Sequence, residues 1–395
     1  MTILEVTDKN LSKEFIDFPK RHYKNDKNWV CPLDAEIEGI FDPSNNACFR
    51  HGEAIRWLLK DNDQKTIGRI AAFIDHKKVN VFRQPTGGAG FFECVNNQNA
   101  ANMLFDTAKA WLQERGMEAM EAPVNFGENF VYWGLLIEGF MQQAYGMQYN
   151  FPYYKELFEN YGFQNFFEQY SFHVDLSLPF NERLVKFAEY IESRPNYSFE
   201  HFSFKNAEKY VNDLVETYNT IWSGFHKSYS PLKHEEIWKM LKESKPVIDE
   251  EFIWFAYDNG KPIAMVIIFP DINQLLKKLG NGKLNLLNKL KFLYYKNLSK
   301  TITRTRVFVA GVSPDYQNSG IISALFYQFV KVLRKRPQHK EIELSWVGDY
   351  NPKMISIYDK IGGVKAKTHI TYMHLFDENA EFIRFNNEFE GKLYL

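Results

Sequence analysis

Four structural signals occur twice along this chain in the same order, and this internal repeat constrains the fold more than any other feature of the sequence. The first signal is a pair of apolar runs separated by Asp and Asn residues, at 55–74 and again at 252–269. This pattern predicts a β-hairpin. The second signal is a short apolar run that leads through a polar turn into residues at helical spacing, at 90–116 and 310–336.

Two further signals complete each copy. A short strand is predicted at 117–125 and at 341–349, and a short helix at 150–163 and at 350–363. The glycines that close these helices, where a left-handed cap is expected, are Gly162 and Gly362. Each half therefore predicts an α/β architecture, an α+β mixed sheet with helices on both faces.

The chain length of 395 residues suits two such domains. We place the first domain in residues 1–175 and the second in residues 176–395, with an insertion at 271–306 that has no counterpart in the first half. A hydrophobic fraction of 45% is enough for two packed cores and argues against disorder in most of the chain.

Composition limits the classes of function. The formal net charge of −1 argues against a general nucleic-acid surface, and no nucleic-acid partner is expected. The cysteines Cys31, Cys48 and Cys94 lack metal-ligand spacing, so we expect no disulfide framework and no metal site. We find no secretory signal and no apolar run long enough for a transmembrane helix, and we predict a cytoplasmic protein. The sequence is compatible with a homo-oligomer.

The second strand-to-helix turn carries the most specific motif, Val-Ser-Pro at 312–314 followed by Gln317 and Gly320. It resembles the signature of the GNAT N-acyltransferase superfamily, a strand ending in V-x-P and then Q/R-x-x-G-x-G/A opening a helix. The resemblance implies that backbone N–H groups at the helix N-terminus bind the pyrophosphate of acetyl-CoA or another acyl-CoA. Ile322 departs from the pattern, because glycine or alanine usually stands there. The coenzyme-binding residues that the resemblance implies are Val312, Gln317, Asn318, Ser319, Gly320, Ile321, Ile322 and Asn351.

A second block of residues resembles the same family. Asn351 and Tyr358 precede a Gly-Gly turn. In the family, a tyrosine in this block protonates the departing CoA thiolate, a role that suits a phenol with a pKa of about 10. The first copy has Phe158 in place of this tyrosine, and its turn at 95–100 has neither V-x-P nor glycine. We therefore predict two tandem GNAT-like domains, of which the N-terminal one is degenerate.

The group that deprotonates the acceptor amine is harder to identify. Glu343 lies inside an otherwise apolar strand, where a carboxylate is costly unless it is paired or functional, and it is our first candidate. Glu341 shares its face and is the weaker choice, while Asp271 and His226 are further candidates. A paired structural carboxylate remains the alternative interpretation of Glu343.

The insertion at 271–306 contains nine Lys or Arg residues and one Asp, a net charge of +8, together with leucines at helical spacing. The pattern predicts one or two basic amphipathic helices broken near Gly280 and Gly282. Three interpretations stay open: a lid over the acceptor site, a contact with an anionic membrane surface, and a solvated helical pair.

The sequence thus predicts an N-acyltransferase that moves an acyl group, most simply acetyl, from acyl-CoA to a primary amine of a small molecule or peptide. Direct attack in a ternary complex requires no metal. Two alternatives remain. One is an aminoacyl-tRNA-dependent transferase, because tandem GNAT-like domains also occur in that class. The other is a non-catalytic binding protein with a decayed CoA site.

Overall fold

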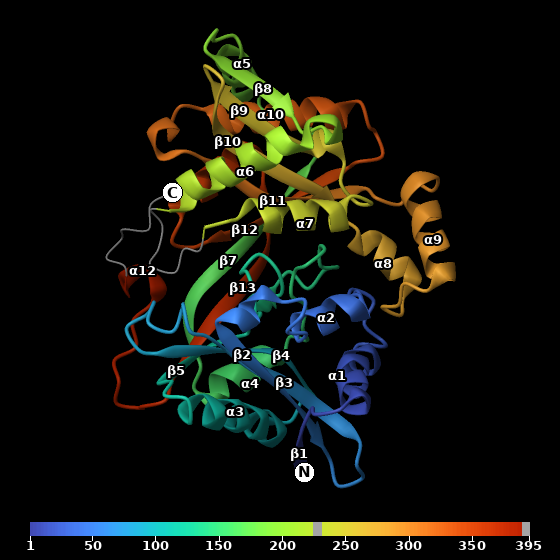
Figure 1. The fold of residues 1–395 in the computed structure, drawn as a ribbon, viewed down its shortest axis with the longest axis vertical. Helices are drawn as coiled ribbons and strands as arrows, with labels where there is room; N and C mark the ends of the chain where they lie inside the picture. The colour runs from blue at the N-terminus through green and yellow to red at the C-terminus, as the bar shows by residue number, and fades with distance from the viewer. Residues whose placement is uncertain (224–230, 389–395) are drawn as a thin grey trace. The chain divides into compact units, whose positions relative to one another are not determined.

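The computed structural model describes residues 1–223 and 231–388, which form two compact units (Figure 1). Unit 1 contains Met1–Gln169, Leu275–Tyr294 and the chain from Lys367 to the end of the described part. Unit 2 contains Tyr170–Gln274 and Tyr295–Ala366. His226, one of the candidate bases, lies outside the described residues.

Unit 1 is a mixed sheet with strands in the order β1-β2-β3-β4-β5-β13-β7, and β6 pairs with β13. The β4–β5 pair is parallel, whereas β1–β2, β2–β3, β3–β4 and β5–β13 are antiparallel. The strands are β1 (Thr2–Glu5), β2 (Gly52–Lys60), β3 (Thr66–Asp75), β4 (Thr86–Cys94), β5 (Ala119–Ala122), β6 (Leu135–Glu138), and the unit 1 parts of β7 (Gln164–Asp175) and β13 (Val364–Leu375). The helices are α1 (Lys9–His22), α2 (Asp34–Ile40), α3 (Gln98–Gln113), α4 (Tyr154–Tyr161) and α12 (Phe385–Glu388).

Both faces of this sheet are buried, because successive strand residues point to opposite sides. Leu58 and Phe73 belong to a cluster with Phe15 of α1, on one face. Their neighbours Leu59 and Ala72 belong to a second cluster that includes the apolar side of α3. The apolar runs of β2 and β3 are therefore continuous, as expected for strands covered on both faces.

Unit 2 repeats this arrangement with strands in the order β7-β12-β11-β10-β9-β8. The β11–β12 pair is parallel, and the β8–β9, β9–β10 and β10–β11 pairs are antiparallel. The strands are β8 (Tyr197–His201), β9 (Ile253–Asp258), β10 (Lys261–Pro270), β11 (Arg304–Val312) and β12 (Glu341–Gly348). The helices are α5 (Glu182–Glu192), α6 (Ala207–Trp222), α7 (His234–Ser244), α10 (Ile321–Arg334) and α11 (Pro352–Lys360).

The same alternation buries both faces of the unit 2 sheet. Ala256 and Val266 pack in a cluster with the apolar side of α10. Phe255 and Met265 belong to a different cluster, which includes Tyr210 of α6. Each hairpin of the repeat thus separates two helical layers.

The structure confirms the predicted fold class and the elements of the repeat. The two hairpins are β2–β3 and β9–β10, and the two strand-to-helix connections are β4–α3 and β11–α10. Gly162 and Gly362 have φ values of 103° and 89°, the left-handed backbone that glycine adopts most readily.

The basic insertion forms two helices, α8 (Asn273–Leu279) and α9 (Leu286–Asn297). They are interrupted where Gly280 and Gly282 have positive φ values of 73° and 70°, in agreement with the predicted break. Two segments that we assigned to the second half, residues 275–294 and the chain from Lys367 to the end of the described part, group with unit 1. There the Gly282 carbonyl accepts a hydrogen bond from the Asp34 N–H at 2.8 Å, and the Lys277 ammonium donates to the Gln142 side chain at 3.0 Å.

Candidate active site

A cavity of about 470 Å³ lies at the N-terminus of α10 in unit 2. This volume is in the range of sites that bind small molecules or part of a large one. The lining residues come from α5, the end of β11, the following turn, α10 and α11. The cavity therefore forms where the second copy of the repeat turns from strand into helix.

The backbone of this turn depends on a glycine. Gly320 precedes the first residue of α10 and has a φ of +86°. A Cβ atom at this position would lie 2.3 Å from a ring carbon of Phe187, so a larger residue would be strained both by its backbone and by its neighbour. Because glycine has no side chain, Gly320 cannot cap α10 with a side-chain hydrogen bond. The first turn of the helix faces the cavity, which Gly320, Ile321 and Ile322 line.

The charges of the cavity lining have one sign. Arg183, Lys353 and Lys360 line it, and the lining contains no Asp or Glu among the described residues. The N-terminus of a helix adds a partial positive charge, and its N–H groups favour anions. The donor set thus fits a ligand that carries phosphate groups.

Most of the predicted coenzyme-binding residues lie at this cavity. Those in its lining are Val312, Gln317, Asn318, Gly320, Ile321 and Ile322. Ser319 and Asn351 are not in the lining: the Ser319 hydroxyl accepts from the Ile321 N–H at 3.4 Å, and the Asn351 side chain accepts from the Met354 N–H at 3.1 Å. Asn351 is thus the N-cap of α11. The binding roles of these residues stay predictions.

Tyr358, the predicted acid, lies on the buried side of α11. Its side chain is in the core cluster of unit 2, with its ring centroid 5.5 Å from that of Phe172. Burial raises the pKa of the Tyr358 phenol well above its usual value, so the hydroxyl remains protonated at neutral pH. Two other residues of the same helix, Met354 and Ile357, line the cavity, whereas Tyr358 does not. Its role as the acid stays a prediction.

Glu343, the predicted base, belongs to a buried charge cluster of unit 2. Its carboxylate is fully buried on β12, and one oxygen, Oε2, lies 3.0 Å from His173 Nε2 and 3.6 Å from an Arg304 nitrogen. Arg304 also forms an ion pair with Asp271 at 2.6 Å. Burial alone would lower the pKa of Arg304, but the carboxylates of Asp271 and Glu343 outweigh it and raise the pKa. The cluster therefore keeps its arginine charged.

A second buried arginine lies beside this cluster. Arg306 donates a hydrogen bond from Nε to the Ser345 hydroxyl at 2.6 Å, and its guanidinium lies 4.6 Å from the centre of the Phe308 ring. In the sequence we counted Arg304 and Arg306 among the cations of the helical insertion. The structure places both at the start of β11, because the alternating run from 304 to 309 pairs with β10 and β12.

Sequence reasoning missed His173 as a member of the cluster. The residue lies on β7, and its side chain is 21% exposed, whereas the Glu343 side chain is inaccessible. Period-two alternation in the strand at 164–175 places His173 on the same face as the buried Ser171. Two polar residues on one strand face were the available signal for a polar cluster there. The pairing of His173 with Glu343 across 170 residues could not be read from the sequence.

The described part of the chain has neither a metal-binding cluster nor a membrane-spanning helix. No group of three or more His, Cys, Asp or Glu side chains there could hold a metal ion. No helix there is long and apolar enough to cross a membrane.

Known proteins resemble this chain in sequence and in fold. Residues 212–363 match the acetyltransferase (GNAT) family. Over 373 residues the chain is 27% identical to the bacterial ceramide synthase of Caulobacter vibrioides, covering 91% of this chain and 94% of that protein. It is 26% identical over 369 residues to protein YghO of Escherichia coli, covering 92% and 93%. A tandem GNAT protein from the clavulanic acid biosynthesis pathway has a similar fold, with a TM-score of 0.56 at 9% identity, covering 96% of this chain and 99% of that one.

The matched region and the fold together support an acyltransferase: residues 212–363 match the acetyltransferase (GNAT) family, and the chain has the fold of a tandem GNAT protein. The two bacterial proteins named above are similar to this chain in sequence over nearly its whole length.

Proposed function

We propose that unit 2 binds an acyl-CoA in the cavity at the N-terminus of α10 and that the enzyme transfers the acyl group to a primary amine. The observation that carries this proposal is the lining of that cavity, which combines a glycine-opened helix N-terminus with three cations and no carboxylate among the described residues. The coenzyme supplies the activated thioester. The protein supplies anion binding through the turn after β11 and through Arg183, Lys353 and Lys360.

Ile322, where the family usually has glycine or alanine, fits this proposal. Its side chain is only 7% exposed and belongs to the core cluster that α10 forms with the sheet. The core therefore takes up most of its bulk, while its backbone keeps the first turn of the helix intact.

Two residues are proposed for the proton transfers. Tyr358 has a hydroxyl that stays protonated and suits the acid that the resemblance implies. His173 is part-exposed and shares a hydrogen bond with the buried Glu343, so we propose His173 as the base and Glu343 as the residue that orients it. This assignment changes the proposed role of Glu343 from base to positioning residue.

The similarity to a bacterial ceramide synthase favours a particular acceptor and donor. A ceramide is an amide formed from a long-chain amino alcohol and a fatty acid. We propose that the amine is of this long-chain type and that the acyl group is a fatty acyl chain rather than acetyl.

The test is a reaction of the purified protein with either acetyl-CoA or palmitoyl-CoA and either a long-chain amino alcohol or a short primary amine. Amide formation by mass spectrometry and release of the free thiol of CoA are measured together. We expect amide and thiol in equal amounts, fastest with palmitoyl-CoA and the long-chain amine. No thiol release with either thioester and any of these amines would contradict the proposal.

Tyr358→Phe tests the acid in the same assay. Loss of a positioned proton donor lowers turnover by about 100-fold or more, whereas the affinity for CoA should not change. Tyr327→Phe is the matched control, because Tyr327 is also a buried tyrosine of unit 2 and lies outside the cavity lining. Equal turnover of the two variants and the wild type would show that Tyr358 is a packing residue.

A further inference from the structure

Helix α9, in the basic insertion, carries an apolar face that remains exposed. Six large apolar side chains on α9 or directly after it are between 50% and 77% exposed. They are Leu286, Leu287, Leu290, Leu293, Tyr294 and Leu298. Soluble proteins rarely leave so many large apolar side chains together in water, and such a patch usually marks an interaction site.

These side chains lie on one side of the helix. Successive residues of an α-helix are rotated by about 100°, which places the five that lie on α9 within an arc of roughly 120°. Asn288 lies on the opposite side and is buried, and its amide donates to the Asn281 side chain at 2.9 Å and to the Lys283 carbonyl at 2.7 Å. The side of the helix that carries Asn288 therefore faces the preceding loop, and the apolar arc points away from these contacts.

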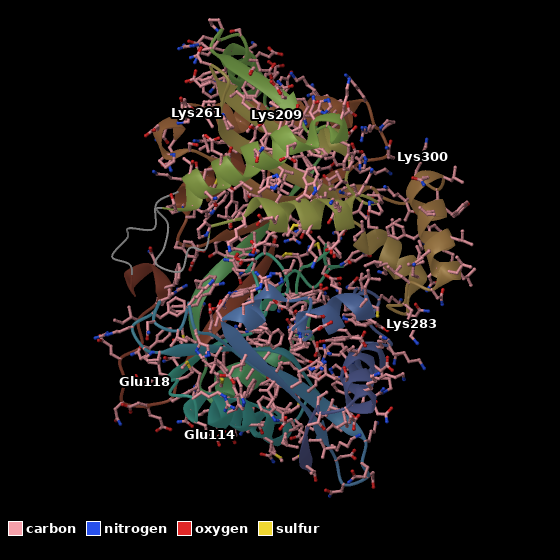
Figure 2. The ribbon with its side chains drawn as sticks, in the orientation of Figure 1. Glu114, Glu118, Lys209, Lys261, Lys283 and Lys300 are labelled. Atoms are coloured by element: carbon pink, nitrogen blue, oxygen red, sulfur yellow. The ribbon has the colours of Figure 1, made fainter. Side chains whose placement is uncertain are left out.

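Lysines border the apolar arc on both sides. By the same rotation, Lys289 lies at one edge of the arc and Lys291 at the other, and both are exposed. Residues 272–300 contain seven lysines and no Asp or Glu. Figure 2 labels two of these lysines, Lys283 before α9 and Lys300 after it, and both are exposed.

The positive charge around this apolar face indicates which kind of partner it suits. A helix with an apolar stripe and lysines along its edges suits the surface of an anionic bilayer, where the stripe enters the acyl boundary and the ammonium groups meet lipid phosphates. A second copy of the chain is a poor partner. A two-fold interface would bring the same lysine-rich patch against itself, with no acidic side chain within residues 272–300 to neutralise it.

We propose that α9 is a membrane-docking helix that binds anionic lipid bilayers and lies in the plane of the interface. The inference rests on α9 itself and not on the proposed function. If the substrates are long-chain lipids, the same contact brings the enzyme to the surface where such molecules are found.

The test is flotation of the full-length protein with vesicles of phosphatidylcholine alone or of phosphatidylcholine mixed with phosphatidylglycerol. We expect the wild type to float with the mixed vesicles and to be released by high salt. The triple variant Leu286→Ser, Leu290→Ser, Leu293→Ser should bind them at least about 100-fold more weakly than the wild type, because it removes most of the apolar area that enters the bilayer. Its matched control is Leu178→Ser with Val364→Ser, which removes two exposed apolar side chains elsewhere and should bind like the wild type.

A charge variant tests the lysines separately. The double variant Lys289→Glu, Lys291→Glu should lower binding by more than about five-fold for each lysine. The control Lys261→Glu, Lys335→Glu changes exposed lysines elsewhere and should bind like the wild type. Equal flotation of the α9 and control variants, or no flotation of the wild type, would overturn the proposal. A dimer in sedimentation velocity that the triple serine variant abolishes would identify a second copy as the partner instead. None of these readouts depends on turnover, so they stand even if the proposed reaction is wrong.

Discussion

The same strand-to-helix connection is closed in unit 1 and open in unit 2. In unit 1 the last residue of β4, Cys94, donates its N–H to the Tyr154 hydroxyl at 3.0 Å and accepts from the Tyr153 hydroxyl at 2.7 Å. The following helix α3 is capped by Asn97, whose side chain accepts from the Ala100 N–H at 3.0 Å. In unit 2 the corresponding helix begins after Gly320, has no capping side chain from that residue and faces a cavity.

The difference shows how one fold can serve two purposes. The orphan N–H and C=O groups at a strand end and a helix start need partners, which can be side chains of the protein or a ligand. Unit 1 supplies its own side chains, in keeping with the loss of the glycine turn. In unit 2 Gly320 supplies no such side chain and the helix start faces the cavity, which supports the proposal that an acyl-CoA binds there.

Buried ion pairs show a similar contrast. In unit 1 Arg69 pairs with Glu93 and also donates to the Phe15 carbonyl at 2.6 Å, and both side chains are less than a tenth exposed. In unit 2 the buried Glu343 joins Arg304 to His173, whose side chain is part-exposed. The first pair is enclosed in a core, whereas the second reaches a residue that water can contact.

The largest effect should come from breaking these two clusters. Glu93→Gln removes the carboxylate from the buried Arg69, whereas Glu343→Gln removes one of the two carboxylates beside the buried Arg304, which keeps Asp271. Glu93→Gln should cost about 3 kcal/mol of unfolding free energy and lower Tm by roughly 6–12 °C, and Glu343→Gln should cost less. Only Glu343→Gln should also lower turnover beyond its effect on stability and alter the pH profile, because only it orients His173. Thermal unfolding and pH–rate profiles below Tm distinguish the two.

Equal loss of turnover in Glu93→Gln and Glu343→Gln would contradict the claim that only the unit 2 cluster takes part in the reaction. Glu216→Gln on α6 is the control for a charge change in unit 2. Its side chain is exposed, so we expect less than about 1 kcal/mol.

A smaller effect is expected from the cations of the cavity. Changing Arg183, Lys353 and Lys360 together to Gln should weaken CoA binding by about 10- to 100-fold and flatten its dependence on salt, because exposed charges each contribute modestly and are screened. Titration of CoA at two ionic strengths measures both effects. Changing Lys65, Lys261 and Lys335 to Gln removes the same charge away from the cavity lining, and equal weakening by that control would mean that net charge alone attracts the ligand.

The smallest effect should be in unit 1. Asn97→Ala removes the side-chain cap of α3 and should cost about 1 kcal/mol of stability, with no change in CoA affinity. Chemical denaturation and CoA titration of the same preparation give both values. A weaker affinity for CoA would show that unit 1 takes part in coenzyme binding.

The sequence was sufficient for the helices, strands and turns of the repeat because their signals are local, but not for the units to which residues 275–294 and the last strand belong. Hairpins, caps and strand-to-helix turns depend on residues close together in the chain, and Gly162, Gly362 and the break at Gly280 all have the backbone that was predicted. One short motif supplies several residues of the cavity lining, Gln317, Asn318, Gly320, Ile321 and Ile322, whose binding roles stay predictions.

The charge cluster could not be predicted, because its members are far apart in sequence. Arg304 meets Asp271 across 33 residues, and His173 meets Glu343 across 170. The burial of Tyr358 could not be predicted either. One side of the short helix α11 faces the core and another faces the cavity, and the sequence does not indicate which residues lie on which side. Here Met354 and Ile357 line the cavity and Tyr358 packs inward.

The most direct test of the central claim, that unit 2 is the half that binds acyl-CoA, is calorimetric titration of CoA into the wild type, Gly320→Glu and Gly260→Glu. Both glycines have a positive φ, of 86° and 85°, so both substitutions strain the backbone. A side chain at Gly260 meets open space in a hairpin, whereas one at Gly320 meets Phe187 and brings a negative charge to the cavity. We predict saturable binding to the wild type and to Gly260→Glu, and binding at least about 100-fold weaker to Gly320→Glu. Unchanged affinity in Gly320→Glu would place the coenzyme elsewhere and contradict the account.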